Sequence, residues 1–187
     1  MTLKEEMKKA LGLIEELNPE SEYLTDDPDI KAKIYDVFNQ VMFELARVKK
    51  IPRYVEIDVS GGDLINFDTI GEACGSTVYQ LSNISGISYE LKAQGTVIKA
   101  LESGTVEIDL YIYPERITEK TKPNAYEFEL SEDALEIMPY GVAADLLKSD
   151  VSSEYGSIYS KRYETMLQRL DPRYSLPCIT IEGGVDI

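Results

Sequence analysis

The chain has 187 residues with 34 acidic and 19 basic side chains, so its formal net charge is −15 at pH 7. Binding the phosphate backbone of a nucleic acid requires clustered lysine and arginine, and the chain shows no such cluster, which argues against a sequence-specific nucleic-acid partner. Histidine is absent and Cys74 and Cys178 lie far apart, which disfavours zinc sites, disulfide frameworks and the common hydrolases that use a histidine base.

Two amphipathic helices are predicted at the N-terminal end. The first begins at the capping box Thr2–Glu5 and ends at Asn18-Pro19. The second begins with Asp27 as N-cap and Pro28 at the first helical position, and it ends at Ile51-Pro52. Its apolar residues recur every three or four positions, at Ile30, Ile34, Val37, Val41, Leu45 and Val48.

From Tyr54 the apolar period changes from that of a helix to that of a strand. Alternation and turn residues predict strands at 54–59, 64–67, 77–81, 87–93, 96–101, 105–113 and 126–130. Gln94-Gly95 is typical of a hairpin turn, and the stretch around Cys74 is predicted to be a loop. So many short strands indicate an antiparallel sandwich or a small barrel.

Helical character returns at Ser131, a candidate N-cap. The apolar stripe continues across Pro139, so either one helix kinks there or a second helix begins at this proline. A last, tyrosine-rich helix is predicted from Ser153 to Leu170, ended by Asp171-Pro172. The remaining residues are extended in character and include a β-prone run at Cys178–Ile181, so they form an arm suited to contact a neighbour.

These elements predict an α+β fold. The helices at 1–52 and 131–171 are expected to pack together as one domain, because neither pair could bury its apolar stripe alone. The β block at 53–130 would be an inserted domain, followed by an extended C-terminal arm at 172–187. No apolar run approaches the roughly 20 residues needed to cross a bilayer, so no membrane partner is expected and a cytosolic location is the default.

Motifs that carry chemistry are weak. Thr25–Asp29 could suggest a calcium loop, but it lacks the glycine and the distal glutamate of an EF-hand, and helix capping explains it. The acids Asp63, Asp68, Glu72, Glu107 and Asp109 could supply a carboxylate pair for glycoside hydrolysis, although alternating acids on a strand are normally its solvated face. No glycine-rich stretch matches a phosphate-binding loop. We therefore predict no catalytic, cofactor-binding or metal-binding residue.

Thirteen tyrosines and no tryptophan suggest protein–protein contact, because tyrosine is amphipathic and enriched at interfaces. Seven of them gather toward the C-terminal half, at Tyr111, Tyr113, Tyr140, Tyr155, Tyr159, Tyr163 and Tyr174. The residues predicted to contact a neighbouring subunit or partner are Tyr159, Tyr163, Tyr174, Leu176, Ile179 and Ile181.

Four segments, 23–30, 39–47, 137–147 and 159–170, resemble the helices of tailed-phage head–tail connector proteins, also called adaptor or head-completion proteins. The likeness includes a helix entered through Met138-Pro139-Tyr140 and a following helix that ends in Leu167-Gln168-Arg169-Leu170. The β block departs from this family, whose smaller members are almost wholly helical, and it would be an insertion displayed on the outside of a ring.

The resemblance implies a non-enzymatic virion protein without cofactors. Such proteins form rings, commonly of twelve subunits, that bind the portal on one side and tail or stopper components on the other, with DNA passing through the centre. It implies assembly in the cytoplasm of a bacterial host and a final place at the head–tail junction. Two alternatives stay open: a ligand- or carbohydrate-binding module that uses the β block, and a carboxylate-based hydrolase that uses Glu107 or Asp109.

Overall fold

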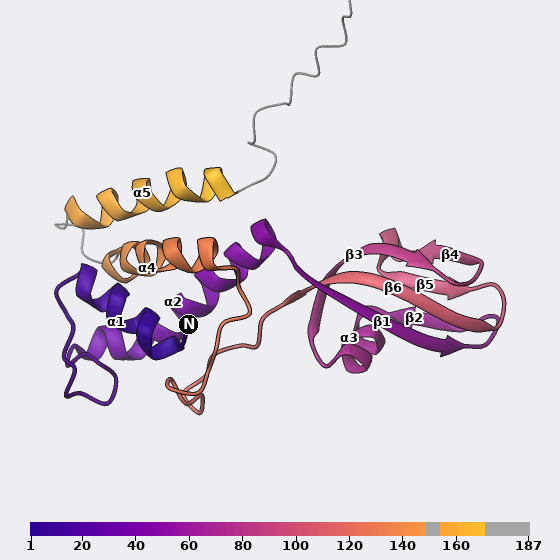
Figure 1. Ribbon diagram of the computed structural model, residues 1–187, viewed down its shortest axis with the longest axis horizontal. Helices are drawn as coiled ribbons and strands as arrows, with labels where there is room; N and C mark the ends of the chain where they lie inside the picture. The colour runs from indigo at the N-terminus through magenta and orange to yellow at the C-terminus, as the bar shows by residue number, and fades with distance from the viewer. Residues whose placement is uncertain (149–153, 171–187) are drawn as a thin grey trace, which may run out of the picture.

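The computed structural model describes residues 1–148 and 154–170, which form a mixed α/β fold (Figure 1). The helices are α1 (Leu3–Leu13), α2 (Pro28–Lys49), α3 (Phe67–Cys74), α4 (Glu132–Leu147) and α5 (Glu154–Leu170), with a 3-10 turn at Ala93–Gly95. The strands are β1 (Ile51–Val59), β2 (Leu64–Asn66), β3 (Thr77–Ser85), β4 (Tyr89–Lys92), β5 (Val97–Ala100) and β6 (Gly104–Tyr113). In Figure 1 α1, α2, α4 and α5 lie together, and the strands and α3 lie at the far end of the molecule. None of the described helices is long and apolar enough to span a membrane.

Helices α1, α2, α4 and α5 form what we call the helical half. Helix α4 lies at its centre, because it packs against the other three. It contains Pro139 in its interior, so the chain forms one helix here and the alternative of two short helices is wrong. The N-cap of α2 is as expected: the Asp27 carboxylate accepts hydrogen bonds from the backbone N–H groups of Asp29 and Ile30.

Helix α1 ends earlier than predicted, at Leu13 instead of near Asn18. Glu15 has a φ of 61°, in the left-handed region, and the backbone N–H of Glu16 donates to the Leu11 carbonyl. This closing turn satisfies a helix-end carbonyl and turns the chain away, which leaves Leu17 exposed.

Within residues 1–148 and 154–170 the strands form two separate three-stranded antiparallel sheets, in the orders β1-β6-β3 and β2-β5-β4, and do not close into a barrel. Strand β6 alternates as predicted, with Val106, Ile108, Leu110 and Ile112 fully buried on one face. Buried side chains of both sheets belong to one apolar core together with Ile70 of α3. The predicted hairpin is confirmed, because β4 and β5 pair across the turn that contains Gln94.

Two expectations for the β block are wrong. The stretch around Cys74 is the end of helix α3, which starts where the Asn66 side chain accepts from the Thr69 N–H and stops at the left-handed Gly75. Residues 126–130 are not a strand and make one isolated bridge, between Glu127 and Thr2. This bridge ties them to the helical half, although the sequence places them in the 53–130 block.

The loop after β6 is anchored on α2 by a buried asparagine. Asn39 donates from Nδ2 to the Ile117 carbonyl over 2.7 Å and accepts at Oδ1 from the Ile117 N–H over 2.8 Å. Ile117 is itself buried, and Phe128 further along stacks on Phe38 of α2. The side-chain amide thus replaces the strand partner that this loop lacks.

A cluster of rings and cations joins the two halves, and we call it the aromatic junction. It consists of Arg47, Lys50, Tyr79, Tyr111 and Tyr113. The Tyr79 ring stacks on Tyr113 with centroids 4.6 Å apart, and its hydroxyl donates to the Ala46 carbonyl over 3.0 Å. Arg47 Nε donates to the Tyr113 hydroxyl over 2.6 Å. These contacts bind the C-terminal end of α2 to strands β3 and β6.

Replacing the Asn39 anchor should destabilise the fold strongly. Asn39→Ala leaves a buried N–H and a buried C=O of Ile117 without partners, so the free energy of unfolding should fall by about 2–4 kcal/mol. Asn124→Ala, at an exposed position of the same loop, should change it by less than about 0.5 kcal/mol. Urea denaturation followed by circular dichroism measures both, and equal effects would show that the anchor contributes nothing.

A buried glutamate should make stability depend on pH. Glu6 is fully buried; one carboxylate oxygen accepts from Lys9 Nζ over 2.8 Å, and the other has no partner among the described residues. Burial raises the pKa of Glu6, so the folded state takes up a proton more readily than the unfolded state. The resulting stabilisation is complete below the unfolded pKa and is lost as pH rises through the folded one.

Glu6→Gln should therefore raise the free energy of unfolding at pH 7 by about 1 kcal/mol, with a smaller gain at pH 5. The exposed Glu16→Gln is the matched control and should have little effect at either pH. Denaturation curves at the two pH values test this, and a larger gain at pH 5 than at pH 7 would contradict it.

Candidate interaction surface

Helix α5 is fastened to the helical half through Tyr163. This side chain is 7% exposed, and its hydroxyl donates to Glu44 Oε2 of α2 over 2.8 Å. Burial and then the Glu44 hydrogen bond raise the pKa of Tyr163, so its hydroxyl stays protonated as the donor. Tyr163 was predicted to contact a partner, but it lies in the chain's own core and is not part of the outer surface.

Glycine at position 141 of α4 makes this packing possible. A Cβ built on Gly141 would lie 2.8 Å from the Tyr163 ring and 3.0 Å from Val41 Cγ1 of α2. Real Cβ atoms essentially never show a contact as short as the first, and the second is tighter than most, so glycine lets α2, α4 and α5 approach at this point.

Tyr159, also predicted to contact a partner, is partly buried one turn before Tyr163 in α5. Its hydroxyl donates to the Leu13 carbonyl at the end of α1 over 2.6 Å, and its ring lies 6.4 Å from that of Tyr140. The Arg162 guanidinium sits 4.3 Å from the Tyr140 ring centroid. The remaining predicted contact residues, Tyr174, Leu176, Ile179 and Ile181, lie outside the described residues.

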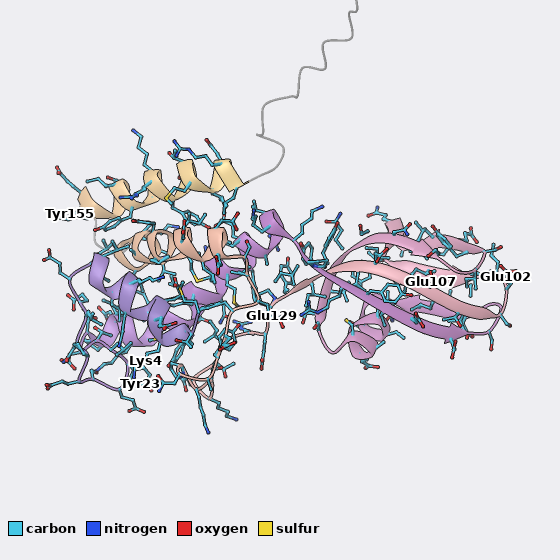
Figure 2. All side chains as sticks on the ribbon, viewed as in Figure 1. Lys4, Tyr23, Glu102, Glu107, Glu129 and Tyr155 are labelled. Carbon is cyan, nitrogen blue, oxygen red and sulfur yellow. The ribbon has the colours of Figure 1, made fainter. Side chains whose placement is uncertain are left out.

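One side of α5 combines exposed apolar groups with positive charge. Tyr155, labelled in Figure 2, is 66% exposed and Ile158 is 55% exposed. A shallow groove of about 520 Å³ follows this side of the helix and is lined by Ile158, Lys161, Arg162, Thr165, Met166 and Arg169. These six residues, which we call the α5 face, include three cations and no acid, within a chain of net charge −15. Ile158 and Met166 belong to the apolar period of this helix, and sequence reasoning missed that three cations lie beside them.

The outer surface of the β1-β6-β3 sheet is acidic. Glu56 and Glu107 are cross-strand neighbours, and Asp109 lies opposite Tyr54 (Glu107 is labelled in Figure 2). The hydrogen bond from the Tyr54 hydroxyl to Glu56, together with some burial, raises the Tyr54 pKa to about 12. These acids form the solvated face that the strand alternation predicts.

The carboxylates proposed for hydrolysis are not brought together as one set. Glu107 and Asp109 belong to β6, Asp68 and Glu72 belong to α3, and Asp63 accepts from the Ser60 N–H in the turn after β1. Among residues 1–148 and 154–170, no group of three or more acidic or cysteine side chains is arranged to hold a metal ion.

A cleft with a volume of about 730 Å³ lies between α3 and the helical half. It is lined by Phe43, Glu72, Tyr113, Glu115 and Arg116, among others, so aromatic rings and charges of both signs face it. Such a mixed lining suits a polar ligand with an apolar side.

No family model matches this chain, and no curated protein matches it significantly.

The close approach at Gly141 gives a sharp test of how α5 is held. Gly141→Ala should lower the free energy of unfolding by about 1–3 kcal/mol, because the added methyl forces Tyr163 and Val41 apart. Gly12→Ala in α1 is the matched control, since nothing lies within 4 Å of a Cβ there, and it should be neutral or slightly stabilising. Thermal denaturation measures the stability of the two variants. A Gly141→Ala protein of unchanged stability would show that α5 does not pack this closely.

Proposed function

We propose that this chain is a non-enzymatic structural protein of a tailed-phage or prophage particle, a head–tail connector. In this role it forms a ring, of twelve subunits by resemblance, between the portal and tail or stopper components. The ring surrounds the DNA channel, after assembly in the cytoplasm of a bacterial host. The observation that carries the proposal is the α5 face, which exposes apolar and cationic side chains on an otherwise acidic protein.

The chemistry of the α5 face suits a protein partner. Burial of large apolar groups such as Ile158 against a partner stabilises the complex, by roughly 25 cal/mol per Å² of apolar area removed from water. Lys161 and Arg169 beside it would pair with acidic groups on the portal or tail component and set orientation and association rate. Because Tyr163 and Gly141 fix α5 to the body, the face is presented without further ordering of the helix.

The charge balance supports a place beside transiting DNA. The net charge of −15 and the acidic outer surface of the first sheet repel the phosphate backbone, so DNA can move past without being retained. The same charges would prevent a DNA-binding role, because binding depends on lysine and arginine that displace counterions.

Light scattering of the purified protein, alone and mixed with the portal protein encoded nearby, tests the proposal. We expect a ring-sized mass or a stable portal complex. Ile158→Asp should weaken that assembly at least tenfold, because it places an acid in the α5 face. Leu101→Asp is the matched control, since Leu101 is 54% exposed but lies in the β block, and it should assemble normally. A strict monomer that ignores the portal would overturn the proposal.

The cleft between α3 and the helical half favours one alternative, a ligand-binding module. Pro52 and Tyr111 are cross-strand partners, so an Asn-Gly turn can replace residues 53–110 and remove most of the β block while keeping the chain ends together. The connector role predicts that this variant, once shown to be folded by circular dichroism, still binds the portal. Loss of portal binding by a folded variant would move the function to the β block.

A further inference from the structure

The two sheets expose two edge strands that line one groove. Strand β3 is an edge of the first sheet and β4 is an edge of the second. Residues of both strands line a groove of about 440 Å³, with Phe67, Tyr79, Leu81, Ile84, Tyr89 and Leu91 as its apolar members. We call it the β3–β4 groove. Among the described residues, one side of each edge strand has no backbone partner in either sheet, so the groove offers main-chain groups as well as apolar side chains.

The apolar core is incompletely covered along this groove. Leu91 of β4 is the cross-strand partner of Ile98, so both side chains point to the same face of the sheet. Ile98 is fully buried, whereas Leu91 is 50% exposed. On the other side, Ile84 of β3 pairs with the fully buried Ile108 and is itself only partly buried. The inner face of the β block therefore opens to solvent where a further strand would close it.

Of the two edges, β4 is the better acceptor for an added strand. Strand β3 has register irregularities between Val78 and Gln80 and between Leu81 and Asn83, and such bulges hinder regular pairing. Strand β4 pairs with β5 without a shift, and all four of its residues are exposed. Its charges, Glu90 and Lys92, pair with each other and leave no net charge to repel an incoming chain.

The chain contains a segment with the right pattern. Seventeen residues follow Leu170, and fully extended they would reach about 60 Å. Within them Ile179 and Ile181 alternate with Cys178 and Thr180, so a strand here would have one strongly apolar face. Pro177 stands just before this run, where its missing N–H does no harm to a ladder.

We propose that the β3–β4 groove receives the Cys178–Ile181 run of a second copy of this chain. The run adds to β4 as a fourth strand, and Ile179 and Ile181 cover Leu91 and Ile84. Each copy would place its tail in the groove of one neighbour and receive the tail of another. Such a head-to-tail contact is the kind from which rings are built. The inference rests on the proposed function in that it assigns the subunit contact of the ring.

Two complementary variants, mixed in solution, test whether the tail of one copy binds in the groove of another. Leu91→Lys places a charge in the groove and leaves the tail intact, whereas Ile179→Asp/Ile181→Asp spoils the tail and leaves the groove intact. Each variant alone should run as a monomer of 21.1 kDa in light scattering, and their mixture should give a complex of one copy of each. A mixture that stays monomeric would overturn the proposal, because it would show that no copy supplies the groove of another.

A labelled peptide of residues 171–187 separates the remaining outcomes. It should bind the Ile179→Asp/Ile181→Asp protein saturably in fluorescence anisotropy. Adding Leu91→Lys should weaken binding at least tenfold, and adding Leu101→Lys, the exposed control outside the groove, should leave it unchanged. A wild-type protein that stays monomeric while the two variants form the mixed complex would mean that each chain fills its own groove, which overturns the assignment to a second copy. Portal binding by the Ile179→Asp/Ile181→Asp protein is measured separately. The outcome for the connector role is therefore independent of the outcome for the contact between tail and groove.

Discussion

The arrangement of this molecule depends on the passage from α2 into β1, which takes a single residue. Lys50 adopts a φ of 51° between Lys49 and Ile51, so the chain turns sharply. No longer linker separates α2 from β1 about which the β block could rotate. Strand β6 returns beside β1 along its whole length, and the aromatic junction holds this strand pair on the end of α2. The direction in which the β block projects is therefore set by covalent geometry and ring packing together.

Elements with strong local signals could be predicted from the sequence, and those that depend on distant partners could not. Helix α2 and strand β6 carry their own period and turn residues, so they lie where expected. Residues 126–130 carry a strand pattern, but a strand forms only when a neighbouring edge is free, and the N-terminal residues and α2 take this segment instead. Helix α3 had a readable signal, the cap Asn66 and the left-handed Gly75, in a stretch too short to show a period.

The same difference between local signals and distant partners explains why the candidate surface was only partly predicted. Periodicity shows that α5 has an apolar side, but it does not show whether that side meets α4 or a partner, and Tyr163 belongs to the internal contact. The tyrosines were expected to favour contact with other proteins, yet several hydroxyls bind inside the chain, such as those of Tyr79 and Tyr159. Tyrosine suits such joints because the ring packs while the hydroxyl satisfies a carbonyl at a helix end.

The attachment of the N-terminus to late parts of the chain has a consequence for biosynthesis. Leu3 donates its N–H to the Tyr126 carbonyl, and α1 packs against α4, whereas the ladders of the two sheets lie within residues 51–113. On the ribosome, the sheets can complete their pairing while the first two helices still wait for their partners. The apolar stripes of α1 and α2 are thus the surfaces of the nascent chain that remain uncovered longest, and they are where a chaperone would bind.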